Sequence, residues 1–416
     1  MTLPHGPERD ATLAFLREGY AFVGRRCDAL GTDGFRTRLM LSPVTCIRGR
    51  EAAAAFYHPG RFTRRGAMPR TTVRLLQGAR SVQALDGAAH RHRKAMFMGL
   101  MTRERVSEIA ARVTDLLEDR LAPGREIVLH EAAIGALAEA ALEWTGCDAA
   151  PGEVDARAEE CAAMVAEAGS VGPSYLRAWR LRRRAERWAR ATIERARRSE
   201  GGPRDATPLS VIARHRDPRG RPLDTGEAAT ELINLLRPLV AVSRYIIFTA
   251  MALRDQPGWR DRLRADAHLA EPFAREVRRL APFFPVIAGR VLEPFEWRGH
   301  AFARDDWVVL DLYGTNRDAI AFDDADAFLP ERHGPPSLDP QAPFGGLEPD
   351  APAPQGAGDH HATHRCPGEF MTVAIMREAA LRLAALDYAV PDQDLSIDLA
   401  AMPALPASGF RLKRAG

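Results

Sequence analysis

Apolar positions recur at helical spacing along most of the chain. Three long segments, 104–121, 129–146 and 177–198, combine this spacing with residues that favour helices. Strand-like patterns are few, and the best of them are 43–49 and 296–314. The pattern therefore predicts a mostly helical fold with a small β component.

Two segments lack this periodicity and are predicted to be loops. Residues 201–226 are rich in Gly, Pro and Asp, and residues 333–365 show almost no regular pattern. A structureless loop as long as the second is usually functional or disordered. No internal repeat is visible, so we expect a single domain over residues 1–416.

The composition is that of an ordinary globular protein, with 46% hydrophobic and 27% charged residues. A net charge of +3 is too small to indicate binding to nucleic acid or to an anionic membrane. The arginines of 177–198 follow the spacing of a solvated amphipathic helix, which also argues against nucleic acid. Five scattered cysteines, with no paired spacing, favour a reducing cytoplasm over a disulfide framework.

No segment of the sequence has the pattern of a membrane span or a signal peptide. The most apolar stretch, 239–253, is interrupted by Arg244 and preceded by Glu231 and Arg237. The first residues, MTLPHGPERDATLAF, lack a basic region followed by an apolar run. We therefore expect no membrane span.

Arg237 and Pro238 interrupt an apolar helical pattern, ELINLLRPLVAVSRY, at residues 231–245. A buried guanidinium without a partner is strongly destabilising. Proline cannot donate to the carbonyl of Asn234, so we expect the helix to open or kink there. Both features predict a site that holds an anion.

Cys366 stands directly before Pro367, where a long helical pattern begins. Proline suits the first position of a helix, so we expect the sulfur to lie at a helix N-terminus, which stabilises a thiolate. Such a thiolate is a nucleophile or a metal ligand, and the alternative is an inert buried cysteine. A zinc site with His360, His361 and His364 matches no closed Cys/His spacing.

Further motifs occur in a fixed order along the chain. Glu276 and Arg279 lie three residues apart on a predicted helix, and Arg332 follows before the cysteine loop. His90 and Lys94 lie one helical turn apart. Together with Cys366-x-Gly368 and His364, this ordered set resembles the cytochrome P-450 family.

The resemblance implies a cytochrome P-450 fold, with haem b buried between the long central helix and the cysteine loop. It makes Cys366 the axial iron ligand and Glu276, Arg279 and Arg332 a structural cluster. The sequence departs from the general family at Asp359 and Ala362, where Phe and Gly are usual. The central helix also lacks the acid–alcohol pair of oxygen-activating monooxygenases and reads NLLRPLVA instead.

This departure is typical of a smaller branch, the bacterial fatty-acid peroxygenases. The chain resembles that branch in REGYAFVGRR, ALDGAAHRHRK, ELINLLRPLVA, LDLYGTNRD, HRCPGE and MPALPASGF. The resemblance implies that Arg237 binds the fatty-acid carboxylate, with Pro238 beside it. The bound carboxylate then acts as the general acid and base that the chain lacks, and hydroxylation at the α or β carbon is expected. The implied partners are a fatty acid and hydrogen peroxide, with no redox partner.

The same resemblance suggests supporting roles. His90, Lys94 and Arg64 are expected at the haem propionates, and ordinary packing is the alternative. Gln83 favours hydroxylation over decarboxylation. Gln77 is expected near the distal face, and Val286 is expected to line the acyl channel or simply to pack in the core. Three other functions stay open, a fatty-acid decarboxylase of the same branch, a monooxygenase fed by electron carriers and a non-catalytic haem- or lipid-binding protein.

Overall fold

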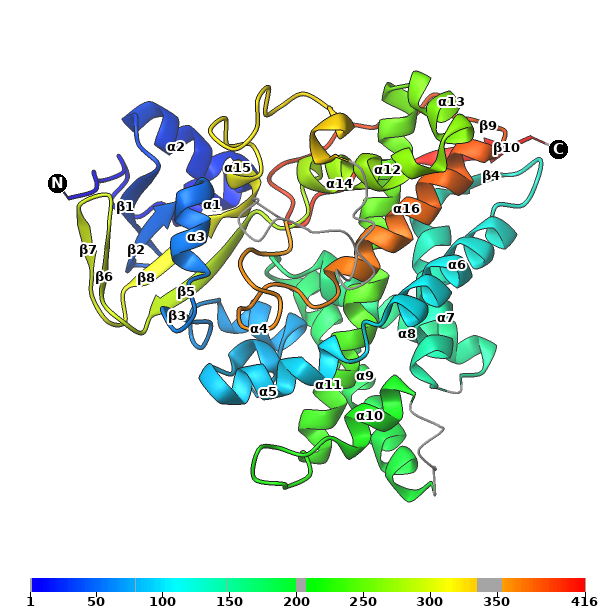
Figure 1. The fold of residues 1–416 in the computed structure, drawn as a ribbon, viewed down its shortest axis with the longest axis horizontal. Coiled ribbons are helices and arrows are strands. Elements are labelled where there is room, and N and C mark those ends of the chain that lie inside the picture. Colours follow the sequence, from blue (N-terminus) through cyan, green and yellow to red (C-terminus); the bar gives the residue numbers. More distant parts are fainter. Residues whose placement is uncertain (1, 79, 148, 200–206, 335–353, 416) are drawn as a thin grey trace.

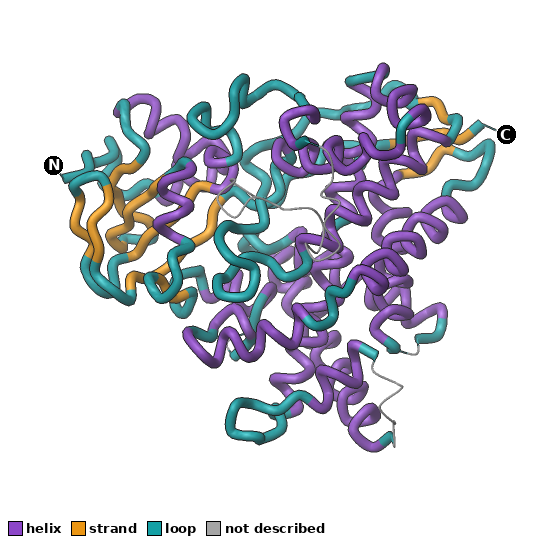
Figure 2. Tube along the Cα trace, in the orientation of Figure 1, coloured by secondary structure: helices purple, strands orange, loops and turns teal. Residues whose placement is uncertain are grey.

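A computed structural model describes residues 2–78, 80–147, 149–199, 207–334 and 354–415. Most of these residues are helical (Figure 1). A five-stranded sheet lies on the N-terminal side of the molecule, and most of the helices lie on the other side (Figure 2). The mostly helical fold with a small β component, predicted from the pattern, is confirmed.

The helices of the described residues carry the larger part of the core. They are α1 (Thr12–Glu18), α2 (Phe22–Leu30), α3 (Arg50–Phe56), α4 (Arg70–Leu76), α5 (Gly87–Met98), α6 (Arg103–Arg120), α7 (Leu129–Thr145), α8 (Pro151–Ala166), α9 (Pro173–Arg198), α10 (Pro208–Arg214), α11 (Thr225–Ala241), α12 (Ser243–Asp255), α13 (Gly258–Ala265), α14 (Ala270–Leu280), α15 (Leu312–Thr315) and α16 (Glu369–Ala385). Four short 3₁₀ helices are η1 (Gly19–Ala21), η2 (Val82–Ala84), η3 (Ala267–Leu269) and η4 (Pro330–His333).

The main sheet has the strand order β1-β2-β8-β5-β3. Strands β2 and β8 are parallel, with Cys46 opposite Val309, and the other pairs are antiparallel. The strands are β1 (Gly34–Leu39), β2 (Ser42–Ile47), β3 (Phe62–Thr63), β5 (Val286–Val291) and β8 (Trp307–Asp311). Smaller sheets join β4 (Glu126–Val128), β10 (Arg411–Arg414) and β9 (Tyr388–Ala389), and separately β6 (Phe295–Trp297) and β7 (His300–Phe302).

Most elements predicted from periodicity are present. The predicted helix 104–121 is α6, 129–146 is α7 and 177–198 is the larger part of α9, which begins four residues earlier. Residues 43–49 contain most of β2, and 296–314 contain β7, β8 and part of β6 before ending in α15. Arg-rich α9 buries its small and aliphatic positions against α8 and α11, which explains its periodicity.

The predicted loop 201–226 is wrong over part of its length. Residues 208–214 form α10, because Pro208 occupies the first helical turn and the Thr207 hydroxyl caps it by accepting from Ser210 N. Helix α11 then begins at Thr225, capped by Asp224. In the other predicted loop, residues 354–365 form turns and bends without a helix or strand, and 335–353 lie outside the described residues.

Helices α11 and α12 form the apolar centre of the molecule. In the described residues, the joined span Thr225–Asp255 is the single helix long and apolar enough to cross a membrane, but 83% of its most apolar window is buried inside the fold. It is therefore a core helix. The helix does not end at Pro238, where an opening or kink was expected. Helix α11 continues through Pro238 and ends at Ala241. Its irregularity lies four residues later, at Val242.

Candidate active site

Cys366 lies in a loop that passes between the helices and the main sheet, ahead of α16 (Figure 1). The predicted helix start at Pro367 is wrong, because Pro367 and Gly368 form a turn and the helix begins at Glu369. Burial raises the pKa of the Cys366 thiol, while the Gly368 backbone N–H acts in the opposite direction. A coordinating metal ion would favour the thiolate form against this burial.

A side-chain network that sequence reasoning missed lies behind the sulfur. Gln355 Nε2 lies 3.7 Å from Cys366 Sγ, and Gln355 Oε1 accepts from Arg278 Nη1 at 3.0 Å. Arg278 also pairs with the fully buried Glu369 at 2.6 Å, which in turn accepts from Arg365 at 2.7 Å. These contacts fix the loop against α14 and α16. Gln355 lies in an aperiodic segment, so no pattern could have singled it out.

Basic side chains that form no ion pair among the described residues gather beside the loop. Arg64 is buried and donates to the Ala288 carbonyl at 3.1 Å, and the tilted rings of His90 and His364 lie with their centroids 4.0 Å apart. These three residues are among those that line a hollow of about 80 Å³, as is the acid Asp86. Lys94 donates to the carbonyls of Thr363 and Arg365. Burial lowers the pKa of His90 to about 4 and that of Lys94 to about 8.

The arrangement fits a thiolate-ligated haem. A buried guanidinium such as that of Arg64 needs an anion to offset its desolvation, and haem propionates are anions that end at one edge of a flat apolar group. The His90 and His364 rings, whose pKa values are lowered by burial, can serve there as neutral hydrogen-bond donors. Arg64, His90 and His364 lie where they can meet such groups, beside the loop that carries Cys366. Zinc does not fit, because the described residues contain no group of three or more His, Cys, Asp or Glu that could hold a metal ion. His360 instead contacts Glu369 at 3.0 Å.

The structure brings Glu276, Arg279 and Arg332 together. Arg279 donates to the two Glu276 oxygens at 2.7 and 2.8 Å, and Arg332 Nε donates to Oε1 at 3.2 Å. His333, which sequence reasoning missed, lies 2.8 Å from Oε2. Although burial opposes it, hydrogen bonds from Arg279 and His333 lower the pKa of Glu276 to about 2. This cluster joins α14 to η4.

Arg237 lies one turn before the C-terminal end of α11 and is 7% exposed. Among the described residues, no hydrogen bond or ion pair to its guanidinium is found, and its Nε is a buried donor without an acceptor. Burial lowers the pKa of Arg237 to about 10, with the nearby Arg182 acting in the same direction and the charge of Cys366 opposing it. Arg237 therefore stays protonated at neutral pH. Pro238, half-buried, follows it within the continuous helix.

A polar network on the same helix reaches the two predicted glutamines. Asn234 Nδ2 lies 3.2 Å from the Gln77 carbonyl and 3.3 Å from Gln83 Oε1. It also lies 3.1 Å from Oε2 of Glu231, a fully buried carboxylate. Glu231 Oε1 accepts from Arg93 Nη1 and from Val82 N, both at 2.8 Å. Glu231, Asn234 and Arg93 were not predicted, because their contacts join residues about 140 to 160 positions apart.

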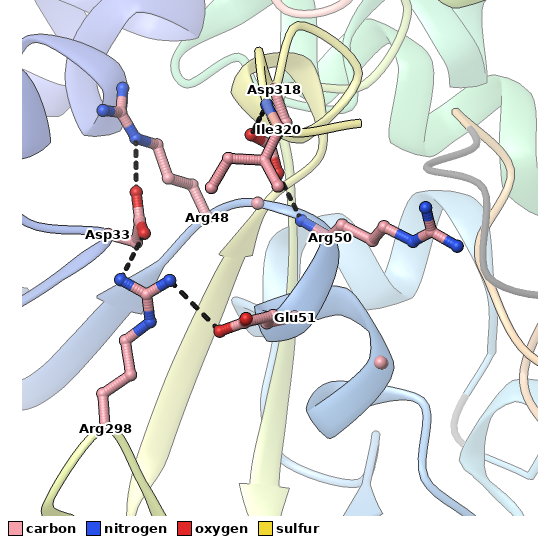
Figure 3. A pocket seen from close by; sticks show the side chains of 9 residues that line it. Asp33, Arg48, Arg50, Glu51, Arg298, Asp318 and Ile320 are labelled. Carbon is pink, nitrogen blue, oxygen red and sulfur yellow. Dashed lines mark hydrogen bonds and ion pairs between the residues drawn. The ribbon is translucent and has the colours of Figure 1, made fainter. Parts of the chain in front are cut away.

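Val286, the first residue of β5, is half-buried and packs against the apolar cluster formed by α2, β1 and β2. A separate polar hollow of about 390 Å³ lies beside the main sheet (Figure 3). Its charges pair with one another, Arg298 with Asp33 at 2.5 Å and with Glu51 at 3.1 Å. No residue with a predicted role lines it.

Comparisons with known proteins agree with this site. No protein-family model matches the chain. The solved structure of a single-substitution variant of cytochrome P450SP alpha (CYP152B1) is 42% identical, with a TM-score of 0.91 and 98% of each chain covered. Cytochrome P450EX alpha (CYP152N1) with myristic acid is 38% identical, with a TM-score of 0.89 and 100% of each chain covered. A variant of cytochrome P450 OleT in complex with arachidonic acid is 31% identical, with a TM-score of 0.92, covering 99% of this chain and 98% of that chain.

Identities of this size over nearly the full length of both chains go beyond a shared fold. The P450 resemblance noted in the sequence is confirmed, and with it the expectation of thiolate-ligated haem. The chain belongs to the CYP152 family of cytochromes P450, the hydrogen-peroxide-dependent fatty-acid peroxygenases.

Proposed function

We propose that this peroxygenase hydroxylates long-chain fatty acids at the α or β carbon, and that Arg237 holds the substrate carboxylate. The observation that carries the proposal is the state of Arg237, a buried cation in the central helix with no anionic partner among the described residues. Guanidinium grips a carboxylate through two parallel hydrogen bonds, which offsets the cost of burial. The solved relatives with myristic and arachidonic acid support a fatty-acid ligand.

The proton chemistry is assigned to the substrate itself. Glu231 is the nearest buried carboxylate on α11, but both of its oxygens accept hydrogen bonds from Arg93, Val82 and Asn234. Pro238 has no hydroxyl or N–H to exchange a proton. The carboxylate held by Arg237 is therefore the group placed to take a proton from hydrogen peroxide and to return it. A fixed headgroup also fixes the carbons beside it, which favours attack near the carboxyl end.

The cofactor is haem, for which Cys366 is the proposed axial ligand, with Arg64, His90 and Lys94 as proposed partners of the propionate edge. Haem when bound supplies the oxidising chemistry, and a thiolate ligand promotes cleavage of the O–O bond. Glu276, Arg279 and Arg332 are proposed to hold the proximal side in shape. Val286 and Gln77 keep their proposed places near the substrate. None of the five cysteines forms a disulfide, which supports a cytoplasmic location.

One assay tests the function. Purified holoprotein is mixed with hydrogen peroxide and a saturated long-chain fatty acid, without any reductase, and the products are identified by mass spectrometry. The proposal predicts 2- or 3-hydroxy acids. A terminal alkene one carbon shorter than the fatty acid, as the main product, would instead show decarboxylation. Gln83 favours hydroxylation over this outcome. Turnover that needs an electron-transfer partner would overturn the proposal.

A further inference from the structure

Asn234 presents an unused hydrogen-bond acceptor one helical turn before Arg237. The residue is 7% exposed, and its Oδ1 is buried without a donor. Arg237 Nε is likewise a buried donor without an acceptor. Residues three apart share one face of a helix. An acceptor and a donor, both buried and both without partners, therefore lie on the same face of α11.

The orientation of the Asn234 amide is fixed by its surroundings. Its Nδ2 lies near three acceptors, Glu231 Oε2 at 3.1 Å, the Gln77 carbonyl at 3.2 Å and Gln83 Oε1 at 3.3 Å. Exchange of the amide nitrogen and oxygen would place an oxygen against the Gln77 carbonyl and the Glu231 carboxylate, so the network favours the orientation with Nδ2 toward these acceptors. Glu231 cannot move to relieve it, because Arg93 and Val82 N hold its other oxygen at 2.8 Å. Oδ1 must therefore face away from this network.

A fatty-acid carboxylate cannot satisfy Oδ1, because an ionised carboxylate has no donor. The group that completes the site must donate a hydrogen bond, and it must fit beside a bound carboxylate. Hydrogen peroxide meets both conditions, because it is small, neutral and carries two O–H donors. One O–H can point to Oδ1 while the other points to the substrate carboxylate.

We propose that Asn234 Oδ1 binds hydrogen peroxide, next to the carboxylate held by Arg237. This inference rests on the proposed function and adds the residue that receives the oxidant. Asn234 exchanges no proton; it holds one O–H so that the other is left to the carboxylate. Glu231 and Arg93 then act as positioning residues, because they keep the oxygen of the amide turned toward the site.

The test measures the peroxide KM and fatty-acid binding separately in the holoprotein. Asn234→Leu keeps the volume but removes the acceptor, so the KM for hydrogen peroxide should rise about tenfold, the effect of one lost hydrogen bond. The dissociation constant of the fatty acid, read from the haem absorption shift, should change less than about twofold. Glu231→Gln should also raise the peroxide KM. The new side-chain NH2 group at position 231 can donate to the Asn234 oxygen, so the Asn234 amide can rotate away from the site. Asn316 offers a matched control, since it is buried at the end of α15 and its Oδ1 has no donor among the described residues. Asn316→Leu should leave the peroxide KM unchanged.

A second measurement does not depend on the variants folding. A crystal structure of the parent holoprotein with a fatty acid should show an ordered water, in place of peroxide, within hydrogen-bond distance of Oδ1. A parent that turns over fatty acid with peroxide, and an Asn234→Leu variant with the same peroxide KM, would overturn this inference alone. An Oδ1 covered by the acyl chain, or a variant that loses fatty-acid affinity instead, would overturn it too. A parent without peroxide-driven turnover would overturn both proposals.

Discussion

Arg332 donates a hydrogen bond to Glu276 at 3.2 Å across 56 residues of sequence. The carboxylate is fully buried and is shared with Arg279 and His333. Three basic side chains thus share the Glu276 carboxylate as their acidic partner. Removal of that carboxylate would leave buried positive charge without compensation.

Glu276→Gln is expected to lower the free energy of unfolding by about 3–5 kcal/mol and to reduce the haem content of the purified protein. Urea unfolding and haem absorbance measure both effects. Glu143 is the control, because it pairs with Arg112 at 2.6 Å on an exposed surface. Glu143→Gln should cost less than about 1 kcal/mol. Equal effects of the two substitutions would contradict the role of the cluster.

Arg64→Ala should weaken haem retention. The guanidinium is buried, forms no ion pair among the described residues and lines the hollow beside His364 and Asp86. Loss of a charge-assisted hydrogen bond should speed transfer of haem to an excess apo-globin about tenfold or more. Arg48, half-exposed and paired with Asp28 at 2.6 Å, gives the control. If the Arg48→Ala and Arg64→Ala variants release haem at the same rate, Arg64 does not bind the haem propionates.

Asp311 should make stability depend on pH. Burial raises its pKa from 3.8 to about 7, although its Oδ1 accepts from Gly314 N at 2.8 Å. The folded state therefore keeps a proton that the unfolded chain releases. The contribution of this proton to the free energy of unfolding is complete below about pH 4 and is lost as the pH rises toward 7. Asp311→Asn should remove that loss and stabilise the protein at pH 8 by about 2–4 kcal/mol. Unfolding titrations at pH 5 and pH 8 test this, and an equal gain at both values would refute it.

The sequence predicted those parts of the site that break a local rule. Arg237 and Pro238 were visible because they interrupt an apolar helical pattern, and Cys366 because it precedes a long one. Long-range contacts left no such trace. Asn234 and Glu231 look like ordinary polar positions of a helix until α11 packs beside residues 77–83. Gln355 lies in a segment without periodicity.

Two helices were also predicted wrongly. The start of α16 was placed too early because proline suits a first helical turn, whereas Pro367 and Gly368 form a turn before the helix. Helix α10 was missed because its seven residues are bordered by Gly, Pro and Asp.

The proposed hydroxylation depends on binding of the substrate carboxylate by the Arg237 guanidinium. The dissociation constant of a long-chain fatty acid, read from the absorption shift of the holoprotein, tests this contact in three forms of the chain. Arg244 supplies the matched control, because it is equally buried on α12 and contacts His130 at 3.5 Å without an acidic partner among the described residues. Arg237→Ala should weaken binding about a hundredfold while haem stays bound, and Arg244→Ala should bind as the parent does. An Arg237→Ala variant that binds the fatty acid with parental affinity would contradict the proposed contact.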